Sequence, residues 1–171
     1  MSGIIKNNIL KILNPVSGDI VDSINLMNKD ELENIFNISS HYSDWSKLDL
    51  SIRCNIINKF RKVILSNRKN IENIIKDETE KSDNDIFIEF LTTLEHLKEI
   101  VKIARVGLKK ERRNTGIMKL KKAFVQYEPI GTIGIISPWN YPLATPLGAC
   151  VEALLAGNNI VLKPSEHTPL T

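Results

Sequence analysis

Cysteine is scarce in this chain of 171 residues, which contains only Cys54 and Cys150. Two cysteines cannot form a disulfide framework, and their spacing matches no metal-binding motif, so we predict no metal site. No apolar run approaches the length of a membrane span, and the first residues lack the apolar segment and small-residue cleavage site of a signal peptide. These absences predict a cytoplasmic protein with no membrane partner.

A strong excess of charge of one sign is also missing. The formal net charge is +3, which is too small to predict a nucleic-acid partner. Residues 109–122 are locally different, because they hold seven basic side chains and one acidic one. This stretch fits either a polyanion-binding patch or a solvated loop beside a strand edge. We favour the solvated loop because no aromatic residues interleave with the charges.

What is present is the composition of an ordinary globular protein, with 42% hydrophobic and 25% charged residues. Residues 1–27 hold short apolar runs around the turn signal "NPVSGD" and predict an extended arm with a hairpin. Residues 28–108 show helical periodicity and begin with a capping-box pair, Asn28 and Glu31. The longest helix is predicted over residues 82–107. Its buried face is expected to comprise Ile86, Phe87, Phe90, Leu91, Leu94, Leu97 and Val101.

The last forty residues predict a βαβ unit. "GTIGIIS", residues 131–137, and "NIVLKP", residues 159–164, read as buried strands. Between them, Thr145 and Pro146 are expected to start a helix, and Gly157 is expected to end it. Short connections favour a parallel pair with a right-handed crossover. A further strand is predicted in "KKAFVQYEP", residues 121–129, so the fold class is α/β.

Polar residues follow both strands of this unit, and ligands bind beyond the carboxyl ends of strands in open α/β sheets. Residues 137–140 follow the first strand, and residues 163–166 follow the second. A carboxylate there can accept hydrogen bonds from ribose hydroxyls, and Lys163 can donate to ribose or phosphate oxygens. The glycine-rich phosphate motif G-x-G-x-x-G is absent, so the motif alone gives only moderate support for a dinucleotide site.

Several segments together resemble the aldehyde dehydrogenase superfamily. They are "EPIGTIGIISPWNYPL", "ALLAGNNIVLKPSEHTPLT" and "NPVSGDIV". "DETEKS" also lies where members usually have an "ETGK"-like turn, with Glu80 in place of the glycine. The resemblance extends from about residue 13 to residue 171. It implies the N-terminal third of that fold, with a helical segment followed by the first βαβ unit of a Rossmann-like parallel sheet.

The resemblance implies roles for individual residues in the oxidation of an aldehyde with NAD, or alternatively NADP. Asn140 corresponds to the catalytic asparagine whose amide stabilises the oxyanion. The expected cofactor contacts are Ile136, Ser137, Pro138, Trp139, Asn140, Lys163, Pro164, Ser165 and Glu166. Lys163 and Glu166 correspond to the pair that holds the adenosine ribose. Residues 119–129 are expected in the oligomerisation region of a homo-oligomer, and residues 130–171 in the cofactor-binding domain.

The nucleophilic cysteine and the general-base glutamate of the family are expected after residue 171. Neither Cys54 nor Cys150 lies in a sequence context that matches the family's nucleophile, and both are expected to be structural. Three hypotheses therefore stay open: a segment of a working enzyme, an inactive truncated fragment, and a binding or assembly module. A reductase of acyl phosphates or acyl-CoA is a weaker alternative, because the "PWN" and "KPSE" motifs are both intact.

Overall fold

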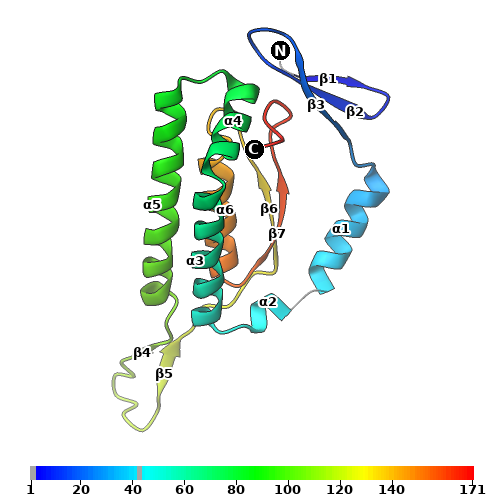
Figure 1. Cartoon of the computed structure of the whole chain (residues 1–171). Coiled ribbons are helices and arrows are strands. Elements are labelled where there is room, and N and C mark those ends of the chain that lie inside the picture. Colours follow the sequence, from blue (N-terminus) through cyan, green and yellow to red (C-terminus); the bar gives the residue numbers. More distant parts are fainter. Residues whose placement is uncertain (1–2, 42–43) are drawn as a thin grey trace.

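A computed structural model describes residues 3–41 and 44–171 of the chain (Figure 1). The elements, in chain order, are β1 (Gly3–Lys6), β2 (Ile9–Leu13), β3 (Ile20–Asn25), α1 (Lys29–His41), α2 (Asp44–Lys47), α3 (Leu50–Ser66), α4 (Arg68–Thr79), α5 (Asp83–Gly107), β4 (Glu111–Arg113), β5 (Ala123–Val125), β6 (Thr132–Ile136), α6 (Ala144–Leu155) and β7 (Asn159–Lys163).

Strands β1, β2 and β3 form a small antiparallel sheet in that order. Asn7 and Asn8 join β1 to β2 with φ angles of 53° and 61°, which suit a tight hairpin turn. The turn predicted in "NPVSGD" joins β2 to β3, and there the Asn14 side chain accepts hydrogen bonds from the N–H groups of Val16 and Ser17. The predicted hairpin is confirmed, and β1 adds a strand that the sequence pattern did not reveal.

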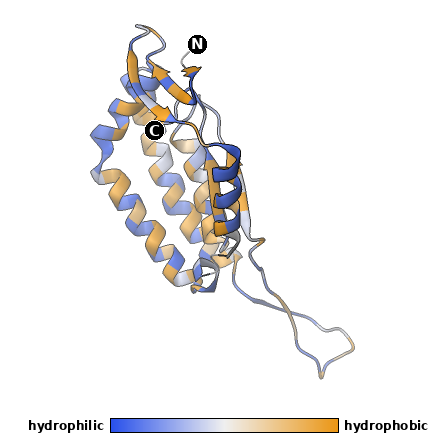
Figure 2. Ribbon diagram, turned by 90° about the vertical axis from the view of Figure 1, so that its right-hand side faces the viewer, coloured by the Kyte–Doolittle hydropathy of each residue, from blue (hydrophilic) through white to orange (hydrophobic). Residues whose placement is uncertain are grey.

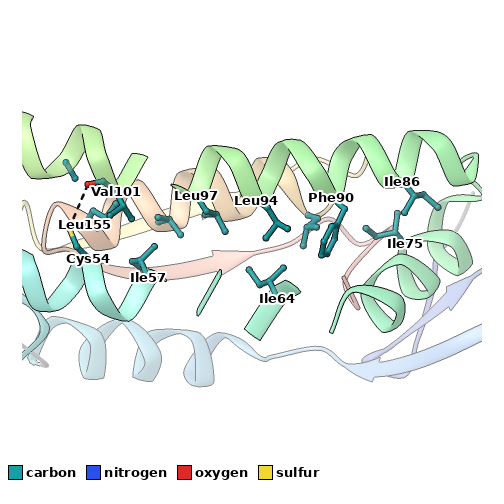
Figure 3. Packing of buried hydrophobic residues seen from close by; sticks show 13 residues of the cluster. Cys54, Ile57, Ile64, Ile75, Ile86, Phe90, Leu94, Leu97, Val101 and Leu155 are labelled. Atoms are coloured by element: carbon teal, nitrogen blue, oxygen red, sulfur yellow. Dashed lines mark hydrogen bonds between the residues drawn. The ribbon is translucent and has the colours of Figure 1, made fainter. Parts of the chain in front are cut away.

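Helices α3, α4 and α5 enclose most of the hydrophobic core, and Figure 3 shows the side chains of α5 pointing toward those of α3 and α4. The buried face predicted for α5 is confirmed except at Phe87 and Leu91, which are 40% and 47% exposed. Each follows a buried residue, Ile86 or Phe90, by one position. Each step along a helix turns the side chain by about 100° around its axis. Phe87 and Leu91 therefore lie beyond the edge of the packed face.

Two of the helix ends are set by local capping. Asn28 and Glu31 exchange hydrogen bonds of 2.8 and 2.9 Å at the start of α1, which confirms the capping box. Ser82 is the N-cap of α5, where its hydroxyl accepts from the N–H of Asp85 at 3.1 Å. Glu80 ends α4 at φ 52° and ψ 26°, the left-handed region that glycine prefers. The turn therefore keeps a glycine-like geometry with a glutamate.

Strands β6 and β7 pair in parallel, with Ile136 opposite Lys163, which confirms the predicted βαβ unit. Helix α6 contacts both strands, and it also packs against α3 and α5. Helix α1 contacts the strands too, and in Figure 1 the pair lies between α6 and α1. The strands were predicted to be buried, but Ile136 is 80% exposed and Leu162 is 40% exposed. The described chain covers this two-stranded sheet only in part.

The start of α6 differs from the prediction. The helix begins at Ala144 with Leu143 in the N-cap position, so Thr145 is not the N-cap and Pro146 is not the first helical residue. No side chain of α6 itself caps this end. The end of the helix is as predicted, because Gly157 follows it with a φ of 92°.

Strands β4 and β5 form an antiparallel hairpin that extends away from the helices, as Figure 2 shows. Only Ala123–Val125 of the strand predicted over residues 121–129 pairs with β4, so the strand is shorter than expected. The basic residues of 109–122 are all exposed, in agreement with the prediction of a solvated loop.

Candidate functional site

The carboxyl ends of β6 and β7 lie side by side. The backbone N–H of Ser137, the first residue after β6, donates to the carbonyl oxygen of Lys163, the last residue of β7, at 3.1 Å. Residues 136–140 and 163–166 therefore leave the sheet from the same edge. The two polar clusters that the sequence placed at this edge, here called the rim, are brought together.

The rim residues differ in their exposure. The exposed ones are Ile136, Pro138, Trp139, Asn140, Lys163 and Glu166, and Pro164 is half-buried. Ser137 and Ser165 are buried, each 6% exposed. The Ser165 hydroxyl accepts from the N–H of His167 at 3.2 Å, so this serine closes the turn after β7. The two serines shape the rim, and the exposed residues form its surface.

Lys163 and Glu166 form an ion pair at the rim. Lys163 Nζ lies 3.4 Å from Glu166 Oε2 and also donates to the carbonyl oxygen of Pro164 at 3.0 Å. The pKa of Glu166 is lowered below its ordinary value, first by a hydrogen bond from the backbone N–H of Glu166 and then by the charge of Lys163. Both side chains are more than half exposed, so the pair is weakly held and can exchange partners with a ligand.

Asn140 is exposed in the turn that connects β6 to α6. Among residues 3–41 and 44–171, no side chain or backbone group forms a hydrogen bond with its side-chain amide. Pro138 and Pro142 restrict φ on either side of it. The Tyr141 carbonyl accepts from the N–H of Thr145 at 3.2 Å, which joins the turn to the first turn of α6. The turn therefore presents an amide that is available to a ligand.

A groove of about 380 Å³ between α5 and α6 begins at the first residue of α6. Its walls comprise Thr92, Thr93, His96, Ala144, Gly148, Ala149 and Glu152. His96 Nε2 lies 3.4 Å from Glu152 Oε1 across it. The groove is narrow at Gly148, where an added Cβ would lie 3.4 Å from His96 Nε2. Ala144, which follows the turn that carries Asn140, lines one end of this groove.

Sequence reasoning missed two residues that contact the turn, Lys81 and Glu89. Glu89 accepts hydrogen bonds from the N–H groups of Leu143 and Ala144, and Lys81 forms an ion pair with Glu89 at 2.6 Å. A signal was present in the sequence, because Glu89 lies three residues after Ile86, on the buried face of α5. A carboxylate in that position needs partners from another element.

Neither cysteine has the surroundings of a nucleophile. Cys54 is 0% exposed and Cys150 is 4% exposed, and burial raises the pKa of the Cys150 thiol above its ordinary value. The raised pKa favours the protonated form of the Cys150 thiol, and both thiols are buried out of reach of a substrate. Both cysteines are therefore core residues, as predicted.

Within the part of the chain that the structure describes, no three His, Cys, Asp or Glu side chains are grouped so that they could hold a metal ion. No helix in residues 3–41 and 44–171 combines the length and the apolar character needed to cross a bilayer.

Comparison with known proteins matches most of the chain to one protein family. The family model described as "Aldehyde dehydrogenase family" matches residues 5–171. Malonate-semialdehyde dehydrogenase 2 of Bacillus thuringiensis is 30% identical over 162 residues, which are 93% of this chain and 32% of that protein. The chain therefore spans about a third of the length of this relative.

Solved structures share the fold. An NAD-dependent benzaldehyde dehydrogenase from Corynebacterium glutamicum has a TM-score of 0.87 at 20% identity, over 96% of this chain and 36% of that one. The glyceraldehyde-3-phosphate dehydrogenase GapN from Methanocaldococcus jannaschii, solved in complex with NADP, has a TM-score of 0.84 at 22% identity, over 94% and 34%. At these identities the likeness concerns the fold alone.

Proposed function

Since the chain belongs to the aldehyde dehydrogenase family, we propose that it supplies the oxyanion-stabilising amide and one part of the cofactor site of an enzyme that oxidises an aldehyde to a carboxylic acid. The observation that carries the proposal is the position of Asn140, exposed at the same sheet edge as the Lys163–Glu166 pair. Oxidation of an aldehyde needs a donor that polarises the carbonyl group and a cofactor that accepts the hydride, and both must lie in one site.

Asn140 acts on the aldehyde oxygen in this proposal. When a nucleophile attacks the carbonyl carbon, negative charge develops on the oxygen, and the amide N–H of Asn140 donates to it. A donor stabilises that charge best when it is already in place, because reorientation during the reaction costs free energy. The two flanking prolines and the start of α6 hold the turn, and the adjoining groove gives room for the aldehyde chain.

The rim residues fit a dinucleotide cofactor. The carboxylate of Glu166, whose pKa is lowered below its ordinary value, can accept from ribose hydroxyls, and Lys163 can donate to ribose or phosphate oxygens. Exposed Ile136 and Trp139 offer apolar surface beside them. Bound NAD or NADP would accept the hydride that leaves the aldehyde carbon. The residues of this chain bind and orient the reactants.

The nucleophile and the general base are not assigned to residues of this chain, because Cys54 and Cys150 are both buried. We propose that they belong to the remainder of the enzyme, which relatives carry beyond the third that matches here. A cytoplasmic location and a homo-oligomeric assembly, both expected from the sequence, complete the proposal.

The test is Asn140→Ala in the protein that carries this chain. Reduction of NAD and NADP is followed by absorbance with simple aldehydes and with malonate semialdehyde as substrates. We expect kcat to fall by roughly 10²-fold or more, the scale of losing one oxyanion donor. The Kd for the cofactor should change little. Asn73→Ala, at an exposed asparagine of α4, is the matched control. A near-normal kcat in Asn140→Ala would refute the assigned role.

A further inference from the structure

Helix α6 receives its N-terminal cap from a different helix. Glu89 of α5 is 1% exposed, and its Oε1 accepts from the N–H groups of Leu143 at 3.0 Å and Ala144 at 3.2 Å. The first N–H groups of a helix have no partner within it, and a negative charge there also interacts favourably with the helix dipole. No side chain of α6 performs this task, so the carboxylate of Glu89 sets where the helix begins.

Lys81 connects this carboxylate to the turn that carries Asn140. Its Nζ lies 2.6 Å from Glu89 Oε2 and 4.3 Å from the centre of the Tyr141 ring, which immediately follows Asn140 in the chain. The Glu89 side chain is 0% exposed and that of Lys81 is 19% exposed. Burial of a carboxylate is costly unless a counter-charge and hydrogen bonds compensate it, and Glu89 has both.

We propose that Glu89 and Lys81 are positioning residues for Asn140. They hold residues 141–144 from one side, while the bond between Ser137 and Lys163 holds the other end of the turn. The Asn140 amide has no hydrogen bond of its own within the described residues, so its place depends on these two anchors. The consequence for catalysis rests on the proposed function, because a misplacement of about 1 Å can cost a large factor in rate.

The placement is tested without any assay of activity. Glu89→Gln is nearly isosteric, keeps one acceptor oxygen and removes the charge that Lys81 pairs with. In the protein that carries this chain, amide exchange at Leu143 and Ala144 should become roughly tenfold faster. Two controls should leave these amides unchanged. Glu99→Gln alters an exposed ion pair on the same helix, and Glu78→Gln alters another buried carboxylate. Unchanged exchange in Glu89→Gln, or equal acceleration throughout the protein, would overturn the proposal.

The role in catalysis is tested by a double-mutant cycle. We expect Glu89→Gln and Lys81→Met each to lower kcat by about tenfold with the cofactor Kd unchanged, and to have little further effect when Asn140 is already alanine. Losses that add fully to that of Asn140→Ala would show a merely structural role and would overturn the proposal. If the unmodified protein oxidises no aldehyde, the proposed function fails, and the exchange experiment still decides whether Glu89 places the turn.

Discussion

In the proposed cofactor site Glu166 and Lys163 hold the ribose, so they also bear on the choice between NAD and NADP. The backbone N–H of Glu166 and the charge of Lys163 lower the pKa of the Glu166 carboxyl group, which favours its negatively charged form. The 2′-phosphate of NADP would bring a second negative charge to the same place. We therefore expect a higher kcat/KM with NAD than with NADP.

Glu166→Gln should move the ratio of the two kcat/KM values toward NADP. The matched control is Glu95→Gln, which removes the carboxylate of another exposed pair, Lys98–Glu95, with the same three-residue spacing. The control should leave the ratio unchanged. An NADP preference in the unmodified protein that persists in Glu166→Gln would contradict a ribose role for this carboxylate.

The position of the rim was predictable from the sequence. The contacts of Glu89 and Lys81 with the turn beside it were not. Lys163 ends β7, and Asn140 and Glu166 lie shortly after the ends of β6 and β7, so the parallel pairing of two neighbouring strands is enough to bring them to one edge. Glu89 acts on Leu143, 54 positions away in the sequence. Sequence periodicity showed that Glu89 lies on a buried face, but only the packing of α5 against α6 determines what it contacts there.

The same distinction holds for the helices and strands. The starts of α1 and α5 were predictable because their caps, Asn28 with Glu31 and Ser82, are within three residues of the groups they satisfy. The start of α6 lies two residues before the predicted one, because the capping group is not the side chain of Thr145 but the carboxylate of Glu89. Sequence rules for capping therefore located the two helix starts at which the capping side chain is close in the sequence to the groups that it caps.

A second buried carboxylate, Glu78 of α4, binds the end of the chain beyond β7. It is 2% exposed and accepts from the N–H groups of Leu170 at 2.7 Å and Thr171 at 3.0 Å, and from the Thr171 hydroxyl. Burial is the largest effect on it and raises the pKa of its carboxyl group above the ordinary value of 4.5, although the three donors oppose this.

The raised pKa predicts the sign of a pH effect on stability. The folded protein holds this proton more tightly than the unfolded chain, so the contribution of Glu78 is fully present below about pH 4.5 and is lost as the pH rises through the higher folded pKa. Urea unfolding of the unmodified protein and of Glu78→Gln should show it, as the free-energy difference between them shifts in favour of the variant with rising pH. A shift in favour of Glu78 would mean that the three donors outweigh burial.

At the scale of the whole molecule, the described chain holds a well-packed helical core beside an incompletely covered parallel sheet. Parallel strands normally have cover on both faces and neighbours at both edges. Here β6 and β7 pair only with each other among the described residues, and Ile136 and Leu162 remain exposed. Such surface favours association with other polypeptide.

A polypeptide of these 171 residues alone should therefore oxidise no aldehyde and should associate. The chemical reason is that both thiols are buried, so an oxyanion never forms for Asn140 to stabilise. Absorbance of NADH tests the first expectation, and light scattering tests the second, with masses above the 19.4 kDa of one chain. Aldehyde-dependent NADH formation abolished by Cys54→Ala or Cys150→Ala would show that a core cysteine was wrongly dismissed. A stable monomer would contradict the expected association.

In the proposed site, the ends of β6 and β7 bind one cofactor together. The most direct measurement is backbone hydrogen exchange in the protein that carries this chain, with and without about 1 mM NAD, the upper end of the usual range of KM values. We expect slower exchange in the peptides that cover residues 136–140 and in those that cover residues 163–166, with β1, β2 and β3 unaffected. Unchanged exchange in both segments, or slowing in only one of them, would contradict it.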